Sequence, residues 1–144
     1  MSRGWAALLL LSIVSALASG CNVQRRYRYL IPQGYTGWLC VSFGVPHAPA
    51  LPVEDGYEIV SFPPSGIVET STALRPGVGY GDEHLFYDGD GNRNVVTSGQ
   101  LGGGFTESSG SARKVEFWVS PDVRRDQNRY VGRGVPVQCG PFAK

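Results

Sequence analysis

The sequence has no excess of charge of either sign once its N-terminal segment is set aside. Thirteen Lys and Arg face twelve Asp and Glu, and Arg3 is the only charged residue before Cys21. The chain from Cys21 onward therefore carries no net charge. Proteins that bind nucleic acid need a basic face that neutralises phosphates, so this composition argues against nucleic acid as a partner.

The sequence also has little that favours helices. Apolar residues rarely recur at helical spacing and Met occurs once, whereas the chain has 20 Gly and 10 Pro. This composition indicates many turns and short elements, and 144 residues suit one domain. We therefore predict an all-β fold, a small antiparallel β-sandwich with long Pro-rich and Gly-rich loops and one short C-terminal helical turn.

The motifs that mark common catalytic and metal sites are missing. No G-x-S-x-G turn presents a serine, and the glycines at Gly102–Gly104 lack the Lys and Ser or Thr of a phosphate-binding loop. His84 and Asp82 form the one simple pairing for a hydrolase, and together with His47 they lack zinc-ligand spacing. The stretch after Asp88 lacks the Gly and Glu of a calcium loop. We expect no enzyme, no cofactor and no metal, with a secreted hydrolase as an unfavoured alternative.

The N-terminal segment has the three regions of a secretory signal peptide. Arg3 precedes an apolar run from residue 5 to residue 18, which is too short to span a bilayer comfortably. Two cleavage sites overlap. The sequence "ALA" at residues 16–18 suits ordinary signal peptidase, and "ASGC" at residues 18–21 resembles the lipobox of bacterial lipoproteins, in which the cysteine is acylated. We favour residues 1–20 as a lipoprotein signal peptide with lipidation at Cys21, and simple secretion is the alternative.

The residues after Cys21 predict a short tether and then the folded domain. The polar stretch at residues 21–28 is interpreted as the tether, and residues 29–144 as one β-sandwich domain. The basic cluster "RRYR" at residues 25–28 could lie against anionic headgroups or be a solvated part of the tether.

Two further cysteines remain if Cys21 carries the lipid. Cys40 and Cys139 are an even pair in an oxidising compartment, which favours a disulfide between them. Two buried free thiols are the alternative.

Alternating and turn-forming residues predict the elements of the domain. Residues 37–44 and 113–120 alternate as strands, with Leu39, Val41 and Phe43 sharing one face of the first. A proline-rich loop is expected at residues 46–56, closed by a turn at Asp55-Gly56. Two hairpins are expected at residues 57–72 and 83–97, a mobile Gly- and Ser-rich loop at 98–112, one or two helical turns at 120–127 with Ser120 as cap, and a last short strand that delivers Cys139.

The aromatic residues are the feature that most suggests a ligand. Tyr35 and Trp38 could form an exposed platform that stacks on sugar rings, or they could fill the core of a small sandwich. The first interpretation gives an alternative function, a module that binds carbohydrate or peptidoglycan.

One block of sequence carries a family resemblance. Ile31, Pro32, Gly34, Tyr35, Gly37 and Trp38 form an opening Ile-Pro-x-Gly-Tyr-x-Gly-Trp, followed by Asp55-Gly56-Tyr57 and Ser65-Gly66. This pattern resembles a domain family of unknown function found in small bacterial proteins, many of them lipoproteins. The resemblance implies no catalytic residues. A weaker likeness in fold is to transthyretin-like and carboxypeptidase regulatory-like sandwiches.

The sequence therefore predicts a lipid-anchored, non-enzymatic protein of the bacterial cell envelope that binds or scaffolds an envelope protein or a cell-wall glycan. In a Gram-negative cell, Asn22 rather than Asp after Cys21 favours the outer membrane, with the domain facing the periplasm. A secreted or periplasmic location is the alternative.

Overall fold

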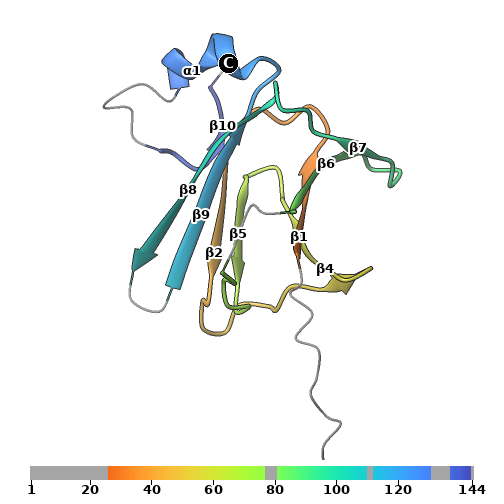
Figure 1. Cartoon of the computed structure of the whole chain (residues 1–144), viewed down its shortest axis with the longest axis vertical. Coiled ribbons are helices and arrows are strands. Elements are labelled where there is room, and N and C mark those ends of the chain that lie inside the picture. The colour runs from red at the N-terminus through yellow and green to blue at the C-terminus, as the bar shows by residue number, and fades with distance from the viewer. Residues whose placement is uncertain (1–25, 77–80, 110–111, 131–136, 144) are drawn as a thin grey trace, which may run out of the picture.

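A computed structural model of the chain consists of two β-sheets packed face to face and one short helix (Figure 1). It describes residues 26–76, 81–109, 112–130 and 137–143, and only the backbone of residues 105–109, 112, 129 and 130. None of the helices in these ranges is long and apolar enough to cross a membrane.

The first sheet has five strands in the order β3-β4-β1-β6-β7. Their bounds are Val53–Glu54 for β3, Tyr57–Ser61 for β4, Arg26–Pro32 for β1, Glu83–Tyr87 for β6 and Arg93–Val95 for β7. The central strand β1 is parallel to both of its neighbours, β4 and β6. The starts of these three strands therefore lie at one end of the sandwich, the lower end in Figure 1.

The second sheet is built around β2. Its strands are β10 (Gly140–Pro141), β2 (Gly37–Phe43), β9 (Ala112–Val119) and β8 (Leu101–Ser109), and β5 (Ile67–Thr70) also pairs with β2. β9 runs antiparallel to β2 along its whole length, whereas β5 is parallel to β2. The helix α1 (Val123–Tyr130) lies at the upper end, opposite the starts of β1, β4 and β6 (Figure 1).

The core lies between the sheets and is largely aromatic. Alternation along β2 and β9 points one set of side chains inward, as predicted from the sequence. The cluster of buried side chains between the sheets includes Tyr27, Tyr29, Ile31, Leu39, Val41, Phe43, Phe62, Phe86, Val115, Phe117 and Val119.

The predicted sandwich is confirmed, and its sheets are mixed rather than purely antiparallel. The chain passes from β1 in the first sheet to β2 in the second, and later from β4 to β5 and from β5 to β6, changing sheets each time. Strands that are neighbours in a sheet are then not joined by tight turns, so parallel pairing is possible.

The prediction of a hairpin at residues 57–72 is wrong, because the chain changes sheets between its two strands. β4 pairs with β1 and β3, and β5 pairs with β2 in the other sheet. The backbone N–H of Phe62 donates to the carbonyl of Leu30, after which Pro63 and Pro64 provide no N–H to continue pairing. The turn that follows carries the chain across the sandwich. The second predicted hairpin is present, as β6 and β7.

Most of the Gly- and Ser-rich stretch predicted as a mobile loop at residues 98–112 forms the strand β8. This strand pairs with β9 from Leu101 to Ser109, with an irregularity between Gly102 and Phe105. Gly102 faces Trp118 so closely that a Cβ atom there would lie 1.9 Å from the indole ring. Gly102 therefore allows Trp118 to pack closely against β8. The prediction of a mobile loop rested on composition alone and did not include this contact.

Two predicted boundaries also differ from the structure. The first is the start of the domain. β1 begins at Arg26, so residues 26–28 of the predicted tether belong to the fold, and Tyr27 is 2% exposed.

The second is the start of the helix. The helix begins at Val123, and Asp122 caps it, because the Asp122 carboxylate accepts the backbone N–H of Arg125. Ser120, the predicted cap, instead accepts the backbone N–H of Asp122.

Candidate functional site

The predicted lipid-attachment residue stands just before the folded domain. Cys21, the signal peptide at residues 1–20 and the start of the tether lie outside the described residues. The first described residue, Arg26, is only five positions after Cys21 and is already part of β1. A lipid at Cys21 would therefore be attached close to the end of the sandwich where β1 begins.

A disulfide fixes the C-terminal segment to the second sheet. The Sγ atoms of Cys40 and Cys139 are 2.07 Å apart and the Cα atoms 5.7 Å apart, and the two residues are 99 positions apart in the sequence. Cys40 is central in β2, and Cys139 forms a bridge beside Trp38 just before β10. The bond therefore closes a loop that contains most of the domain.

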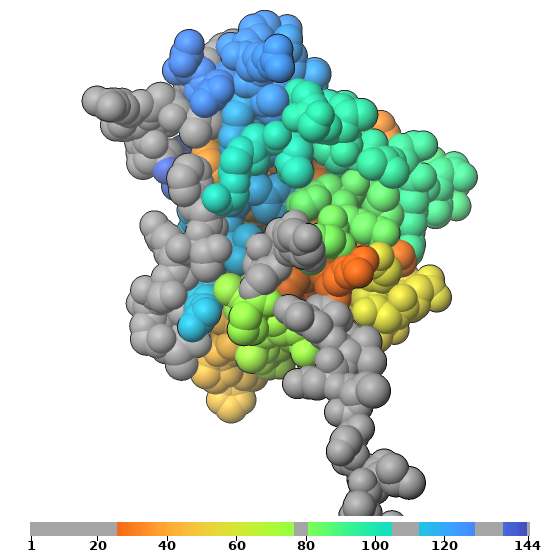
Figure 2. All heavy atoms as spheres, viewed as in Figure 1, coloured from red at the N-terminus to blue at the C-terminus, as the bar shows by residue number. Residues whose placement is uncertain are grey.

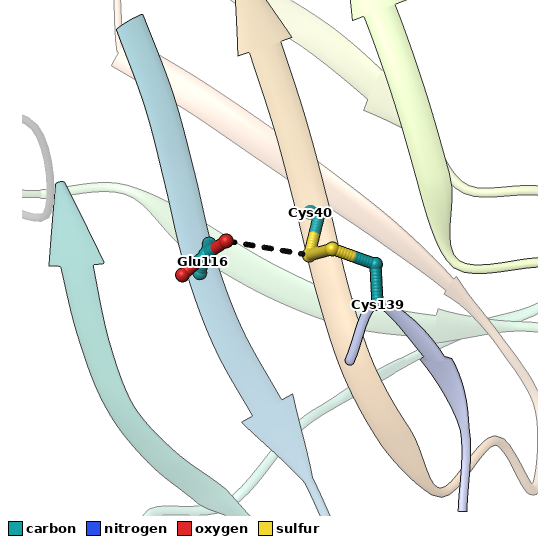
Figure 3. A group of neighbouring side chains, drawn as sticks. All are labelled: Cys40, Glu116 and Cys139. Atoms are coloured by element: carbon teal, nitrogen blue, oxygen red, sulfur yellow. Dashed lines mark hydrogen bonds between the residues drawn. A yellow bond between two sulfur atoms is a disulfide. The ribbon is translucent and has the colours of Figure 1, made fainter. Parts of the chain in front are cut away.

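A buried carboxylate lies beside this disulfide (Figure 3). Glu116 pairs with Cys40 across β2 and β9, and its side chain is almost fully buried on the outer face of the sheet. Its Oε1 lies 4.0 Å from the Sγ of Cys40. A disulfide sulfur has no proton to donate, so this approach is a contact in the oxidised protein and becomes a possible hydrogen bond only for a thiol. Lys114, two residues earlier on β9, forms an ion pair with Glu116.

The chemistry available to this cluster depends on the oxidation state of the sulfurs. The Cys40 and Cys139 sulfurs and a Glu116 oxygen lie within 4.8 Å of one another. Two thiolates and a carboxylate are ligand types that suit zinc, but sulfurs bonded to each other are not thiolates. Sequence reasoning missed Glu116, because strand alternation places Cys40 and Glu116 on outer faces without specifying the register that brings them together.

Tyr35 and Trp38, the predicted ligand-contacting pair, are both buried. Tyr35 is 8% exposed and Trp38 3%, so neither offers an exposed platform for a sugar ring. The Tyr35 hydroxyl donates to the Trp38 carbonyl over 2.9 Å, and burial raises the pKa of Tyr35 to about 12. The Trp38 ring packs beside Trp118, with centroids 6.5 Å apart. The interpretation of these two residues as ligand contacts is corrected to one of packing.

The opening motif of the family resemblance also has a structural explanation. Gly66, in the turn that crosses between the sheets, has a positive φ of 73° and lies against Tyr35. A Cβ atom at this position would lie 2.1 Å from the Tyr35 hydroxyl oxygen. The backbone N–H of Cys40 donates to the Gly66 carbonyl over 2.9 Å. The motif residues Tyr35 and Gly66 therefore hold β2 and the crossing turn together.

The residues considered for a hydrolase have packing roles. The His84 ring stacks on Tyr29 with centroids 4.8 Å apart and meets the edge of Phe117 at 5.1 Å. Burial lowers the pKa of His84, and the nearby charge of Asp82 opposes this shift only in part. The Asp82 carboxylate accepts the backbone N–H of Tyr27 over 2.9 Å.

The stretch considered as a calcium loop is a turn held by its own side chains. Asp88 Oδ1 accepts the backbone N–H groups of Asp90 and Asn92, and Asp88 Oδ2 accepts the side-chain amide of Asn92. These bonds lower the pKa of Asp88. The turn between β6 and β7 therefore already uses the oxygens that a cation would need.

Arg28, part of the basic cluster, is engaged on the outer face of the first sheet. Its Nε donates to Glu83 over 2.7 Å, and its guanidinium group lies 4.2 Å from the centre of the Tyr57 ring. The hydrogen bond from Arg28 lowers the pKa of Glu83. Arg28 therefore helps to hold β1 to its neighbours β6 and β4.

Comparisons with known proteins identify one family and one similar structure. The model of a family of unknown function, DUF6843, matches residues 24–121, from just before β1 to just after β9. A crystal structure of a "Putative Lipoprotein from Bacillus anthracis" is similar with a TM-score of 0.59 and 27% identity, over 76% of this chain and 80% of that chain. A search of the curated proteins gave no match.

Proposed function

The chain belongs to DUF6843, a family of unknown function, and from that premise we propose that it is a lipid-anchored, non-enzymatic protein of the bacterial cell envelope that binds or scaffolds another envelope component. The predicted resemblance to an uncharacterised bacterial domain family is confirmed by this match and by the similar structure from Bacillus anthracis.

The position of Cys21 relative to the fold is the observation that carries the proposal. Cys21 ends the lipobox-like "ASGC", and β1 begins five residues later. Such a short connection would hold the sandwich next to the membrane by one of its ends. The similar structure carries the name "Putative Lipoprotein", which supports the same arrangement.

The Cys40–Cys139 disulfide supports an extracytoplasmic location. Disulfides persist in oxidising compartments and are rare in the cytosol. The sandwich would therefore lie outside the cytoplasm, on the membrane to which Cys21 attaches it, and Asn22 after the lipid favours the outer membrane in a Gram-negative cell.

The use of the polar side chains in packing supports a non-enzymatic role. His84 packs against two aromatic rings, Asp82 accepts a backbone N–H, and Glu116 is paired with Lys114 beside a disulfide. Each of these groups is already used in holding the sandwich together. Binding or scaffolding through the surface of a rigid domain is the function that this arrangement favours.

Membrane attachment is tested by replacing the thiol of Cys21. We expect Cys21→Ser to move the protein from the membrane fraction to the soluble fraction, and Asn22→Ser to stay with the membrane because it keeps the thiol. Mass spectrometry of the membrane-bound protein should find a diacylglycerol thioether on an N-terminal Cys21. An unmodified sulfur, or unchanged fractionation of Cys21→Ser, would refute the anchor.

A further inference from the structure

The loop between β2 and β3 lies at the end of the sandwich where β1 begins. We call residues 45–53, with the sequence VPHAPALPV, the proline loop. Its last residue, Val53, is the first residue of β3. Register places Arg26 beside Tyr57 and Tyr57 beside Glu54, so the start of β1 and the end of the loop are two strand spacings apart, about 10 Å. In Figures 1 and 2 the loop is at the lower end of the coloured part of the molecule.

The proline loop is an exposed apolar surface without a charged side chain. Its only polar side chain is that of His47. Val53 is 46% exposed, and four further apolar residues of the loop are exposed, namely Pro46, Pro49, Ala50 and Pro52. An exposed apolar patch on a small domain often marks a surface that meets a partner or a membrane.

Hydrogen bonds from the neighbouring segment hold the loop in place. The Thr70 hydroxyl donates to the Pro49 carbonyl over 2.8 Å, and the Leu51 backbone N–H donates to the Thr72 hydroxyl over 2.9 Å. The Ile59 backbone N–H donates to the Pro52 carbonyl over 2.9 Å. The apolar residues are therefore presented on a fixed backbone, so contact with a partner would cost little further ordering of the chain.

The connection to Cys21 determines which partner this surface can meet. Five residue steps separate Cys21 from Arg26, and an extended chain spans about 17 Å over that length. The lipid would thus keep the start of β1 within about 17 Å of the headgroups, and the proline loop is at that same end of the sandwich.

We propose that the proline loop rests on the lipid bilayer and, with the lipid at Cys21, fixes the orientation of the sandwich on the membrane. This inference depends on the proposed anchoring at Cys21. Charges of both signs surround the loop, including those of Arg26 and of Asp55, whose side chain is 85% exposed. The contact is therefore made by apolar side chains and does not require anionic lipid. α1, at the other end of the molecule, then points away from the membrane.

A tryptophan placed in the loop tests this orientation. The mature lipidated protein carrying Ala50→Trp would be reconstituted into vesicles of phosphatidylcholine with brominated or unbrominated chains. Gly89→Trp is the matched control, because Gly89 lies in the turn after β6 at the opposite end and a Cβ there meets nothing within 4 Å. Trp38 and Trp118 are buried in both variants and give a common background.

We expect brominated lipid to quench the added tryptophan in Ala50→Trp and not in Gly89→Trp, with the same result when phosphatidylglycerol is included. Val53→Trp is a second probe of the loop if Ala50→Trp does not fold. Vesicle-bound, acylated protein with no quenching at either position would overturn the orientation while leaving the anchor intact. If the tryptophans in the loop are not quenched and the protein sediments as a dimer, the proline loop contacts a second copy of the chain and not the bilayer. Protein without acyl chains on Cys21 would overturn both proposals.

Discussion

Tyr27 and Tyr29 share the inward face of β1 with ring centroids 6.0 Å apart, but only Tyr27 has hydrogen-bond partners for its hydroxyl. Tyr27 Oη donates to the Ala73 carbonyl and accepts the backbone N–H of Arg75. The Tyr29 hydroxyl is buried and has no partner in the described part of the chain. Burial raises the pKa of both phenols, so both stay protonated at neutral pH.

We therefore expect opposite effects from removing the two hydroxyls. Tyr29→Phe should stabilise the protein by up to about 1 kcal/mol, because a buried unpaired polar group costs free energy. Tyr27→Phe should destabilise it by about 1 kcal/mol, because the N–H of Arg75 loses its acceptor. Urea unfolding of the two variants measures both changes. A loss of stability in Tyr29→Phe equal to that in Tyr27→Phe would mean that the Tyr29 hydroxyl is paired.

The half-buried position of His84, packed against Tyr29 and Phe117, predicts a loss of stability at mildly acidic pH. Its pKa is lowered in the folded protein, chiefly by burial. Below the unfolded value of about 6.5 the unfolded chain therefore binds a proton that the folded protein does not. The contribution of neutral His84 to the free energy of unfolding is fully present above that pH. It declines as the pH falls toward the lowered pKa of the folded protein.

Replacing His84 should remove this part of the pH dependence. His84→Phe keeps a ring packed against Tyr29 and Phe117 but cannot titrate. We expect the free energy of unfolding of the natural protein to fall as the pH is lowered below about 6.5, and that of His84→Phe to change less over the same range. Gly89→Ala, which leaves His84 in place and adds a methyl group that meets nothing within 4 Å, is the control and should keep the natural slope. Parallel curves for the natural protein and His84→Phe would contradict the assignment.

Gly34 and Gly66 have nearly the same φ angle but different surroundings, which predicts different tolerance of a methyl group. Their φ angles are 76° and 73°, and a Cβ at Gly34 would meet nothing within 4 Å. Gly34→Ala should cost about 1–2 kcal/mol, the penalty of a left-handed conformation. Gly66→Ala should cost more, because its Cβ would also collide with the Tyr35 hydroxyl and the Trp38 carbonyl.

The double variant Gly66→Ala/Tyr35→Phe separates the two causes. It removes the hydroxyl at 2.1 Å, so it should recover part of the stability lost by Gly66→Ala. The midpoints of urea unfolding give the comparison. Equal losses for Gly34→Ala and Gly66→Ala would show that the turn moves away from Tyr35 at little cost.

The alternation of residue types along the sequence was sufficient to predict β2 and β9, in which the side chains that face the core are more apolar than those on the other face. Leu39, Val41 and Phe43 alternate with less apolar neighbours along β2, and the same is true of β9. The sandwich class and the Cys40–Cys139 pairing also followed from composition and counting, because each depends on few assumptions.

Features set by pairing between distant strands could not be predicted in this way. The Gly-rich β8 is a strand because β9 offers it an edge and Trp118 fills the space beside Gly102. β4 and β5 look like a hairpin locally, but each has a better partner in a different sheet. The contact of Glu116 with Cys40 depends on the register of β2 and β9, and alternation fixes faces without fixing register.

The disulfide should contribute much of the stability of the domain. It joins residues 99 positions apart, and in the chain-entropy model a loop of about 100 residues gives about 4.7 kcal/mol, although residual structure in the unfolded chain reduces this. We expect Cys40→Ala/Cys139→Ala to unfold at lower urea concentration than the natural protein.

Reductant distinguishes loss of the bond from loss of packing at Cys40, which is 1% exposed. Dithiothreitol should lower the unfolding midpoint of the natural protein toward that of the double variant and leave the double variant unchanged. Glu116→Gln in the oxidised protein is a control for the neighbouring carboxylate, and it should respond to reductant as the natural protein does. Free thiols that label fully in the unreduced, unfolded protein, together with a midpoint that ignores reductant, would show that Cys40 and Cys139 are not joined.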